Sequence, residues 1–189
     1  MTETMTNPRL LPRIKVAHAA EASADAAIAV PEAEAPLVVP LSADLVLSLM
    51  LDKGGHYELL KAGFRDLNPN LSDDDIVKIA VSGLHAEVGQ NIKLQGQPGF
   101  VVMATCGGNF EASLIIYTPL WDTVHQHFAG DVVIGIPTPD MLLIGDATNP
   151  DAIAEVRAGI ERVLGNEQPS VTSPSLYRKS PESSELTNY

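Results

Sequence analysis

The sequence predicts an α+β domain, in which a largely antiparallel sheet of hairpins packs against two or three amphipathic helices. Two observations support this class. Between residues 99 and 146 lie four apolar runs of strand length separated by turn residues. Residues 72–92 and 150–164 instead repeat their apolar side chains at helical spacing. A flexible N-terminal arm and a C-terminal tail are expected to flank this domain.

Length and composition set the domain organisation. The chain has 189 residues, 45% of them hydrophobic, which is enough for one domain with a buried core. Residues 1–40 combine low apolar density with several prolines, which predicts an arm that is mostly disordered or loosely attached. Residues 41–165 form the single predicted domain. Residues 166–189 are rich in Ser, Pro and Glu and are predicted to be a tail.

Each terminal segment contains one stretch with an alternative interpretation. Residues 8–16 form a small basic and apolar patch between two prolines, which could instead be a docking peptide or an edge strand. In the tail, Tyr177 could anchor residues 173–178 against the domain.

The charge restricts the kinds of partner. Acidic side chains outnumber basic ones by 24 to 12, which gives a formal net charge of −12. Nucleic acids and anionic membranes need a basic face, so neither is expected as a partner. The charge fits a basic protein partner, or simply solubility. Cys106 is the single cysteine, so no intramolecular disulfide can form, and no signal peptide or run of about 20 apolar residues is visible. A cytoplasmic location is therefore expected.

The first elements of the domain are a strand pair and a helix. Residues 44–51 are apolar on both faces, which predicts a buried strand, and residues 56–60 follow a turn as its hairpin partner. The helix begins after Ser72, the expected N-cap, with Asp75 in the position of a capping box. Its apolar side chains continue at helical spacing as far as Ile92.

The next segment predicts a hairpin. Residues 100–105 and 111–117 are apolar runs that flank Gly107-Gly108-Asn109, a strong turn signal. Residues 93–95 could add one more strand before this pair.

A second hairpin and two helices complete the domain. A short helix that begins near Pro119 carries Trp121, the single tryptophan. Residues 131–136 and 141–144 flank a Pro-Thr-Pro-Asp turn and form the second hairpin. The last helix follows Asn149, its expected N-cap.

Six short motifs occur in a recognisable order: Leu11-Pro-Arg-Ile-Lys15, Leu41-Ser-Ala-Asp-Leu-Val46, Gln90-Asn-Ile, Gly130-Asp-Val-Val-Ile-Gly-Ile-Pro137, Asp140-Met-Leu-Leu143 and Ser173-Pro-Ser-Leu-Tyr-Arg178. This order resembles the bacterial YtpQ-like family, a domain of unknown function, over most of the chain. The resemblance implies no assigned activity. In one departure, Pro139 stands where the family pattern is expected to carry an arginine.

A second resemblance is architectural. From residue 72 to 165 the predicted order is helix, strand, strand, helix, strand, strand, helix. This order is similar to the small acidic chaperones of bacterial type III secretion, which bind an extended partner segment and do no chemistry. Fold analogy alone is a weak basis for assigning a function.

Four residues are the candidate partner-binding site. Asp131, Asp140 and Asp146 lie at strand ends beside turns, and Trp121 is a natural binding anchor if it is exposed. Converging carboxylates could alternatively bind a divalent ion or act as acid and base in a small metal- or carboxylate-dependent enzyme. Turn aspartates more often hydrogen-bond the local backbone, and a lone tryptophan more often belongs to the core.

Other reactive side chains give weaker signals. Cys106 could be a nucleophile with His85 or His125 as its base, but free cysteines are usually buried and inert. On a helix, His125 and His127 diverge by about 200° and would need further ligands to bind a metal. No phosphate loop, zinc-ligand array or nucleophile elbow is present. The sequence therefore predicts no catalytic, cofactor-binding or metal-binding residue and no cofactor.

The expected function is that of a non-enzymatic, acidic protein-binding module of the bacterial cytoplasm. Examples of this class are an immunity protein that neutralises a toxin and a secretion-chaperone-like protein. The partner would be another protein, and the charge favours a basic one. A small enzyme that uses Asp131, Asp140 and Asp146 is the alternative, and a homodimeric structural subunit is a third hypothesis.

Overall fold

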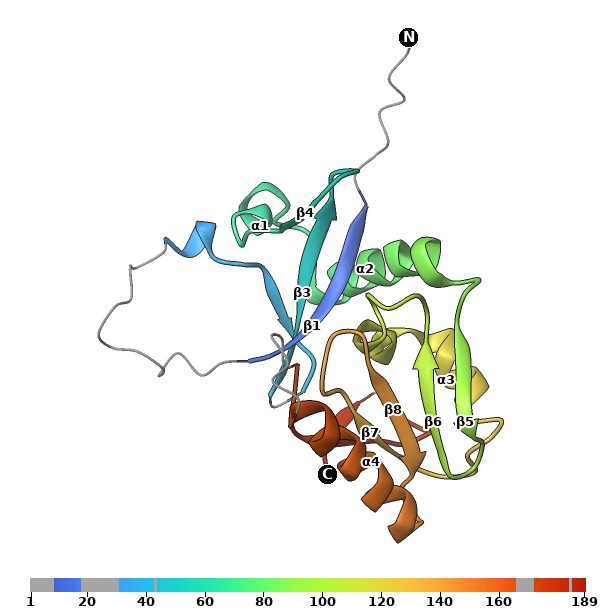
Figure 1. Ribbon diagram of the computed structural model, residues 1–189. Helices are drawn as coiled ribbons and strands as arrows, with labels where there is room; N and C mark the ends of the chain where they lie inside the picture. Colours follow the sequence, from blue (N-terminus) through green and yellow to red (C-terminus); the bar gives the residue numbers. More distant parts are fainter. Residues whose placement is uncertain (1–8, 18–30, 43, 166–171, 184) are drawn as a thin grey trace, which may run out of the picture.

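Two antiparallel sheets and the surrounding helices make up the protein in the computed structural model, which describes residues 9–17, 31–42, 44–165, 172–183 and 185–189. Every strand pairing in these ranges is antiparallel. Helices cover the sheets, so the predicted α+β class is confirmed (Figure 1).

The first sheet is built around β3 (Leu45–Asp52). One side of β3 pairs with β1 (Leu10–Val16), and the other side pairs with β2 (Val38–Pro40) and then with β4 (Tyr57–Leu59). Leu45, Leu47 and Leu49 on one face of β3 are fully buried, and Ser48 and Met50 on the other face are also buried, as expected for a strand at the centre of a sheet. The predicted hairpin between β3 and β4 is confirmed.

The N-terminal segment is part of the sheet wherever the structure describes its strands. β1 pairs with β3 along seven residues, and its Leu11 and Ile14 are buried in the core. The prediction of a loosely attached arm does not hold for β1 or β2, and β1 matches the edge-strand alternative. Composition is uninformative here because the stabilising partner, β3, lies far along the chain. Residues 1–8 and 18–30 lie outside the described residues.

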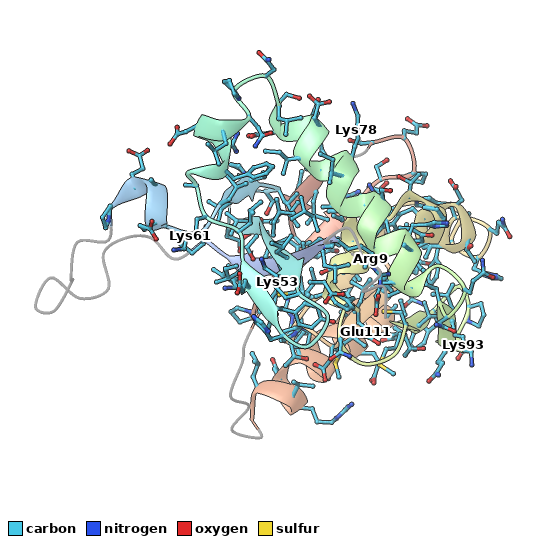
Figure 2. The ribbon with its side chains drawn as sticks, turned by 90° about the horizontal axis from the view of Figure 1, so that it is seen from above. Arg9, Lys53, Lys61, Lys78, Lys93 and Glu111 are labelled. Atoms are coloured by element: carbon cyan, nitrogen blue, oxygen red, sulfur yellow. The ribbon has the colours of Figure 1, made fainter. Side chains whose placement is uncertain are left out.

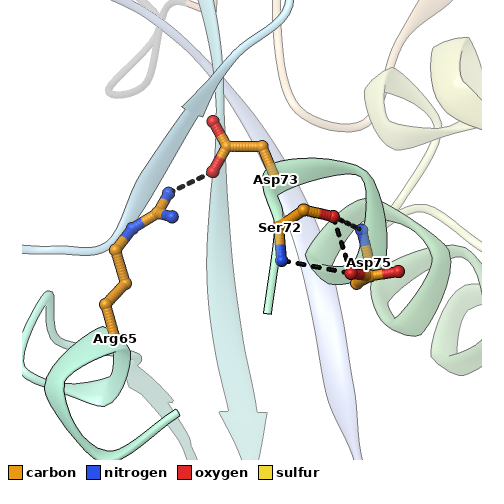
Figure 3. A network of polar contacts seen from close by, with 4 residues as sticks. All are labelled: Arg65, Ser72, Asp73 and Asp75. Atoms are coloured by element: carbon orange, nitrogen blue, oxygen red, sulfur yellow. Dashed lines mark hydrogen bonds and ion pairs between the residues drawn. The ribbon is translucent and has the colours of Figure 1, made fainter. Parts of the chain in front are cut away.

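The longest helix, α2 (Asp73–Val88), follows the short helix α1 (Phe64–Leu67) and packs against β1. Ser72 Oγ accepts a hydrogen bond from the Asp75 N–H (3.2 Å), and the Asp75 carboxylate accepts one from the Ser72 N–H (3.1 Å). This is the predicted capping box (Figure 3). The helix ends at Val88, one turn before the predicted end at Ile92.

The second sheet has six strands in the order β10 (Leu186–Asn188), β9 (Leu176–Lys179), β7 (Val132–Gly135), β8 (Leu142–Asp146), β6 (Val101–Thr105) and β5 (Lys93–Gln97). The predicted hairpin of β7 and β8 is confirmed, as is the additional strand β5.

The C-terminal segment is also part of this sheet. β9 pairs with β7 on one side and with β10 on the other, and Tyr177 is fully buried. The Tyr177 hydroxyl donates a hydrogen bond to the Asp44 carboxylate (3.0 Å), next to the first sheet. The prediction of a tail is therefore wrong for β9 and β10, whereas the expected anchoring by Tyr177 is observed. Residues 166–171 and 184 lie outside the described residues.

The predicted hairpin around Gly107-Gly108-Asn109 is wrong. The second apolar run forms a 3-10 helix, η2 (Ala112–Ile116), and β6 pairs with β8 and β5 instead. The cause is a side chain, because the Glu111 carboxylate accepts hydrogen bonds from backbone N–H groups of the turn and holds the chain there. A short apolar run that is buried on all sides has no period that separates a strand from a helix.

Two further helices enclose the second sheet. α4 (Pro150–Leu164) begins at its predicted N-cap, Asn149, and covers one face. The opposite face shares one continuous core with the first sheet, α2, η2 and α3 (Thr118–Val124). A short 3-10 helix, η1 (Glu32–Glu34), precedes β2. The two sheets therefore meet at a seam that is lined from both ends of the chain.

Candidate functional site

A groove of about 470 Å³ opens at the seam between the two sheets. We call it the central groove. Its apolar wall comes from β2 and the residues after it, α2, η2, α3 and β10: Val39, Pro40, Leu41, Val77, Ile115, Ile116, Trp121 and Leu186. Its polar side chains are Asp73, Asp74, Thr118, Lys179 and Glu185. The volume lies in the range of pockets that bind a small molecule or a short peptide segment.

Lys179 is the basic residue of the central groove. Its side chain comes from the end of β9 and is only 8% exposed. The Nζ donates a hydrogen bond to the Ser183 carbonyl oxygen (2.9 Å) and lies 5.4 Å from the centroid of the Trp121 ring. Among the described residues no carboxylate forms an ion pair with Lys179. Burial lowers the pKa of Lys179 below its usual value because it disfavours the charged form.

Trp121 is a wall of the groove, with only a small exposed surface. The side chain is 5% exposed, and its Nε1 donates a hydrogen bond to the Ile115 carbonyl oxygen (2.8 Å). Of the four candidate residues, it is the one that lines the central groove. It contributes a fixed aromatic ring to the groove wall, but it does not project from the surface as an anchor.

Acidic side chains form part of the edge of the groove. Asp73 and Asp74 lie in the first turn of α2, and Glu185 precedes β10. Asp73 pairs with Arg65 of α1 (2.5 Å), which ties the two helices together (Figure 3). Neither Asp74 nor Glu185 takes part in an ion pair with another described residue, so both charges are available to a ligand.

The three candidate aspartates do not converge. Asp131 and Asp146 lie at the same end of the β7–β8 hairpin, but Asp140 belongs to the turn at its other end. Asp131 accepts a hydrogen bond from Arg178 Nε (2.6 Å). Asp146 accepts hydrogen bonds from the backbone N–H (2.8 Å) and hydroxyl (2.7 Å) of Thr148. The acid–base or metal site that these residues would form together is therefore absent from their observed geometry.

Cys106 is in a structural position. The thiol is buried, and burial together with the nearby Glu111 carboxylate raises its pKa to about 12. A thiol held protonated at neutral pH is a poor nucleophile. His85 bonds to the Tyr117 hydroxyl (2.5 Å) rather than to Cys106.

His125, the C-cap of α3, and His127, which follows it, do not form a metal site with other described residues. His125 packs beside Trp121, and burial lowers its pKa; its Nδ1 has no hydrogen-bond partner among the described residues. No group of three or more His, Cys, Asp or Glu suited to a metal ion occurs in the part of the chain that the structure describes.

Comparisons with protein families, with curated proteins and with solved structures yield no match for this chain. No helix in the described ranges is long and apolar enough to cross a membrane. The site therefore has to be judged from its own geometry.

Sequence reasoning missed the central groove and Lys179. The reason is that Lys179 lies in a segment whose Ser- and Pro-rich flanks resemble a tail. β9 has only four residues, and its buried positions, Leu176, Tyr177 and Lys179, do not alternate regularly with exposed ones, so neither a strand nor a buried lysine is predicted in that setting.

Proposed function

We propose that this protein is a non-enzymatic protein-binding module that holds a segment of a basic partner protein in the central groove. The observation that carries the proposal is the combination of an apolar wall with two acidic side chains, Asp74 and Glu185, that form no ion pair with another described residue. Such a groove complements a segment that alternates apolar and basic side chains.

The distribution of charge supports the same kind of partner. Seven of the twelve basic residues pair with carboxylates: Arg9, Lys53, Lys61, Arg65, Lys78, Arg162 and Arg178. Four of these seven, Arg9, Lys53, Lys61 and Lys78, are labelled in Figure 2. The excess negative charge would raise the association rate with a basic protein, and salt would reduce this effect.

Within this class the finer hypotheses remain an immunity protein and a secretion-chaperone-like protein of the bacterial cytoplasm. The YtpQ-like resemblance rests on the order of six motifs and implies no activity that would favour one of them. No observation favours the alternative of a carboxylate-dependent enzyme, because its three aspartates lie at two ends of one hairpin.

Affinity capture with matched charge-reversal variants tests the proposal. The full chain is immobilised and exposed to lysate of its source organism at low and high salt. The groove variant carries Asp74→Lys and Glu185→Lys, and the control carries Asp66→Lys and Glu161→Lys, which change the net charge equally at exposed positions outside the groove.

We expect a basic protein that the wild type and the control capture at low salt and that the groove variant loses. Thermal unfolding shows whether both variants are folded. Equal capture by the two variants, or no protein specific to the wild type, would contradict the proposal.

A further inference from the structure

Lys179 has an unused hydrogen-bonding capacity toward the central groove. A lysine ammonium has three N–H donors and no acceptor. One donor is used by the Ser183 carbonyl oxygen, and the ammonium lies over the ring of Trp121. Lys179 is only 8% exposed, yet no carboxylate of the described residues balances its charge. A buried charge without a counter-ion is costly, so an anionic ligand group would gain from pairing with it.

The surroundings of Lys179 restrict the anion. The polar side chains that share the groove with it are three carboxylates, Asp73, Asp74 and Glu185, and one hydroxyl, that of Thr118. A phosphate or another multiply charged anion would meet one cation and the other two carboxylates, since Arg65 balances the charge of Asp73, and this disfavours it. A single carboxylate matches the single ammonium. A ligand that also carries a cation would gain from Asp74 and Glu185, which form no ion pair within the part of the chain that the structure describes.

We propose that the central groove recognises the C-terminal end of its partner protein. Lys179 pairs with the terminal carboxylate, a basic side chain close to the chain end lies between Asp74 and Glu185, and apolar side chains pack on the groove wall. Capture of a terminal carboxylate is a recurring mode of peptide recognition. The inference rests on the proposed function, because it names the part of the partner that the groove receives.

A peptide array tests the proposal on the wild-type protein. The array carries hexapeptides whose last four positions permute Leu, Phe, Arg, Lys and Glu, each synthesised once with a free C-terminal carboxylate and once as the amide. We expect binding to free-acid peptides that contain Arg or Lys, with affinity reduced about tenfold or more by amidation.

Three results on the array overturn the proposal. They are equal binding of acids and amides, a preference for Glu over Arg and Lys, and no binding above background. An amide peptide with an internal Glu that binds as well as the free acid would show that the groove reads a side-chain carboxylate. Competition by isobutyrate at the concentration of the peptide would show that it reads a small acid.

Two matched substitutions locate the contact. Lys179→Met should reduce the affinity for the best free-acid peptide to that of its amide and leave the amide unchanged. Lys93→Met, which removes an exposed lysine on β5, should change neither. Thermal unfolding confirms that each variant is folded. If Lys179→Met is folded and still distinguishes the acid from the amide, Lys179 is not the carboxylate contact.

The two proposals fail in different ways. If capture depends on Asp74 and Glu185 but the array shows no acid preference, the protein binds an internal segment and only this inference fails. If the array shows the acid preference but no cellular protein is captured, the site binds chain ends and the proposed protein partner fails.

Discussion

Glu111 is almost fully buried, and its carboxylate is surrounded by donors. It accepts hydrogen bonds from the backbone N–H groups of Cys106 (2.9 Å), Gly108 (2.7 Å) and Phe110 (3.1 Å). Gly107 and Gly108 both have positive φ, which allows the chain to wrap around the carboxylate. One side chain therefore fixes the turn between β6 and η2.

We expect Glu111→Gln to lower the free energy of unfolding by about 1–3 kcal/mol, because an amide NH₂ group would face backbone donors and weaken charge-assisted hydrogen bonds. Urea denaturation measures the change. Glu182→Gln, at an exposed position, is the control and should have little effect. A Glu111→Gln variant as stable as the control would show that the turn does not depend on this carboxylate.

Lys179 should contribute to binding at the expense of stability. Burial lowers its pKa, so the unfolded chain holds this proton more tightly than the folded protein. The contribution of Lys179 to stability therefore falls as pH decreases from the usual lysine pKa through the lowered folded pKa.

At neutral pH we expect Lys179→Met to have an unfolding free energy equal to or above that of the wild type. The difference between the two proteins should narrow as pH rises toward the usual lysine pKa. Thermal or urea unfolding across that pH range checks both statements. A marked loss of stability in the variant at neutral pH would indicate a structural role for the ammonium.

At the scale of elements, α2 and β1 approach each other closely at Gly83. A Cβ added to Gly83 would lie 1.9 Å from the carbonyl oxygen of Leu10. The absence of a side chain at this point lets the backbone of the helix lie directly on the edge strand. The position of β1 in the fold therefore depends on one glycine in the partner helix.

Gly83→Ala should destabilise the protein by about 1–3 kcal/mol or more, because the clash is with backbone atoms. Without the clash, this change in a helix would stabilise it by roughly 0.5–1 kcal/mol. Urea denaturation gives the size, and faster tryptic cleavage at Arg13 or Lys15 would show that β1 is released. Gly55→Ala is the control, since a Cβ there meets no atom within 4 Å. Stabilisation by Gly83→Ala would rule out the close approach.

The capping box of α2 gives a pH-dependent contribution. Hydrogen bonds from Ser72 lower the pKa of Asp75, which is most stable as the carboxylate in the folded protein. Its contribution is therefore complete above the usual aspartate pKa and is lost as pH falls through the lowered folded pKa. Wild type should exceed Asp75→Asn in stability at pH 7, and the two should become similar in strong acid. A difference that does not depend on pH would contradict this account.

At the scale of the whole molecule, the sequence predicts those caps and hairpins that depend on contacts between residues close together in the chain. The capping box at Ser72, the β7–β8 hairpin and the N-cap at Asn149 each depend on contacts within a few positions, and each is observed. The sequence pattern predicts an arm and a tail at β1 and β9 because the partners of these strands, β3 and β7, lie far along the chain. The central groove shares this property, because residues from both halves of the sequence line it.

The candidate site was predictable only in part. Trp121 does line the central groove, although it is buried. Asp131, Asp140 and Asp146 have the residue type of a site, but a hairpin separates residues at its turn from those at its ends by the length of its strands. Lys179 has no local signal, because its burial results from the packing of β9 against Trp121 and the Ser183 segment.

Site-specific photo-crosslinking in the source organism tests the central claim, that the groove holds a partner protein, most directly. A benzophenone side chain replaces Thr118, which is exposed and lines the groove, or Gln95, which is exposed on β5 and serves as the control. We predict one discrete crosslinked protein from position 118, lost when Asp74→Lys and Glu185→Lys are added, and none from position 95. No adduct at 118, or the same adducts at both positions, would contradict the account.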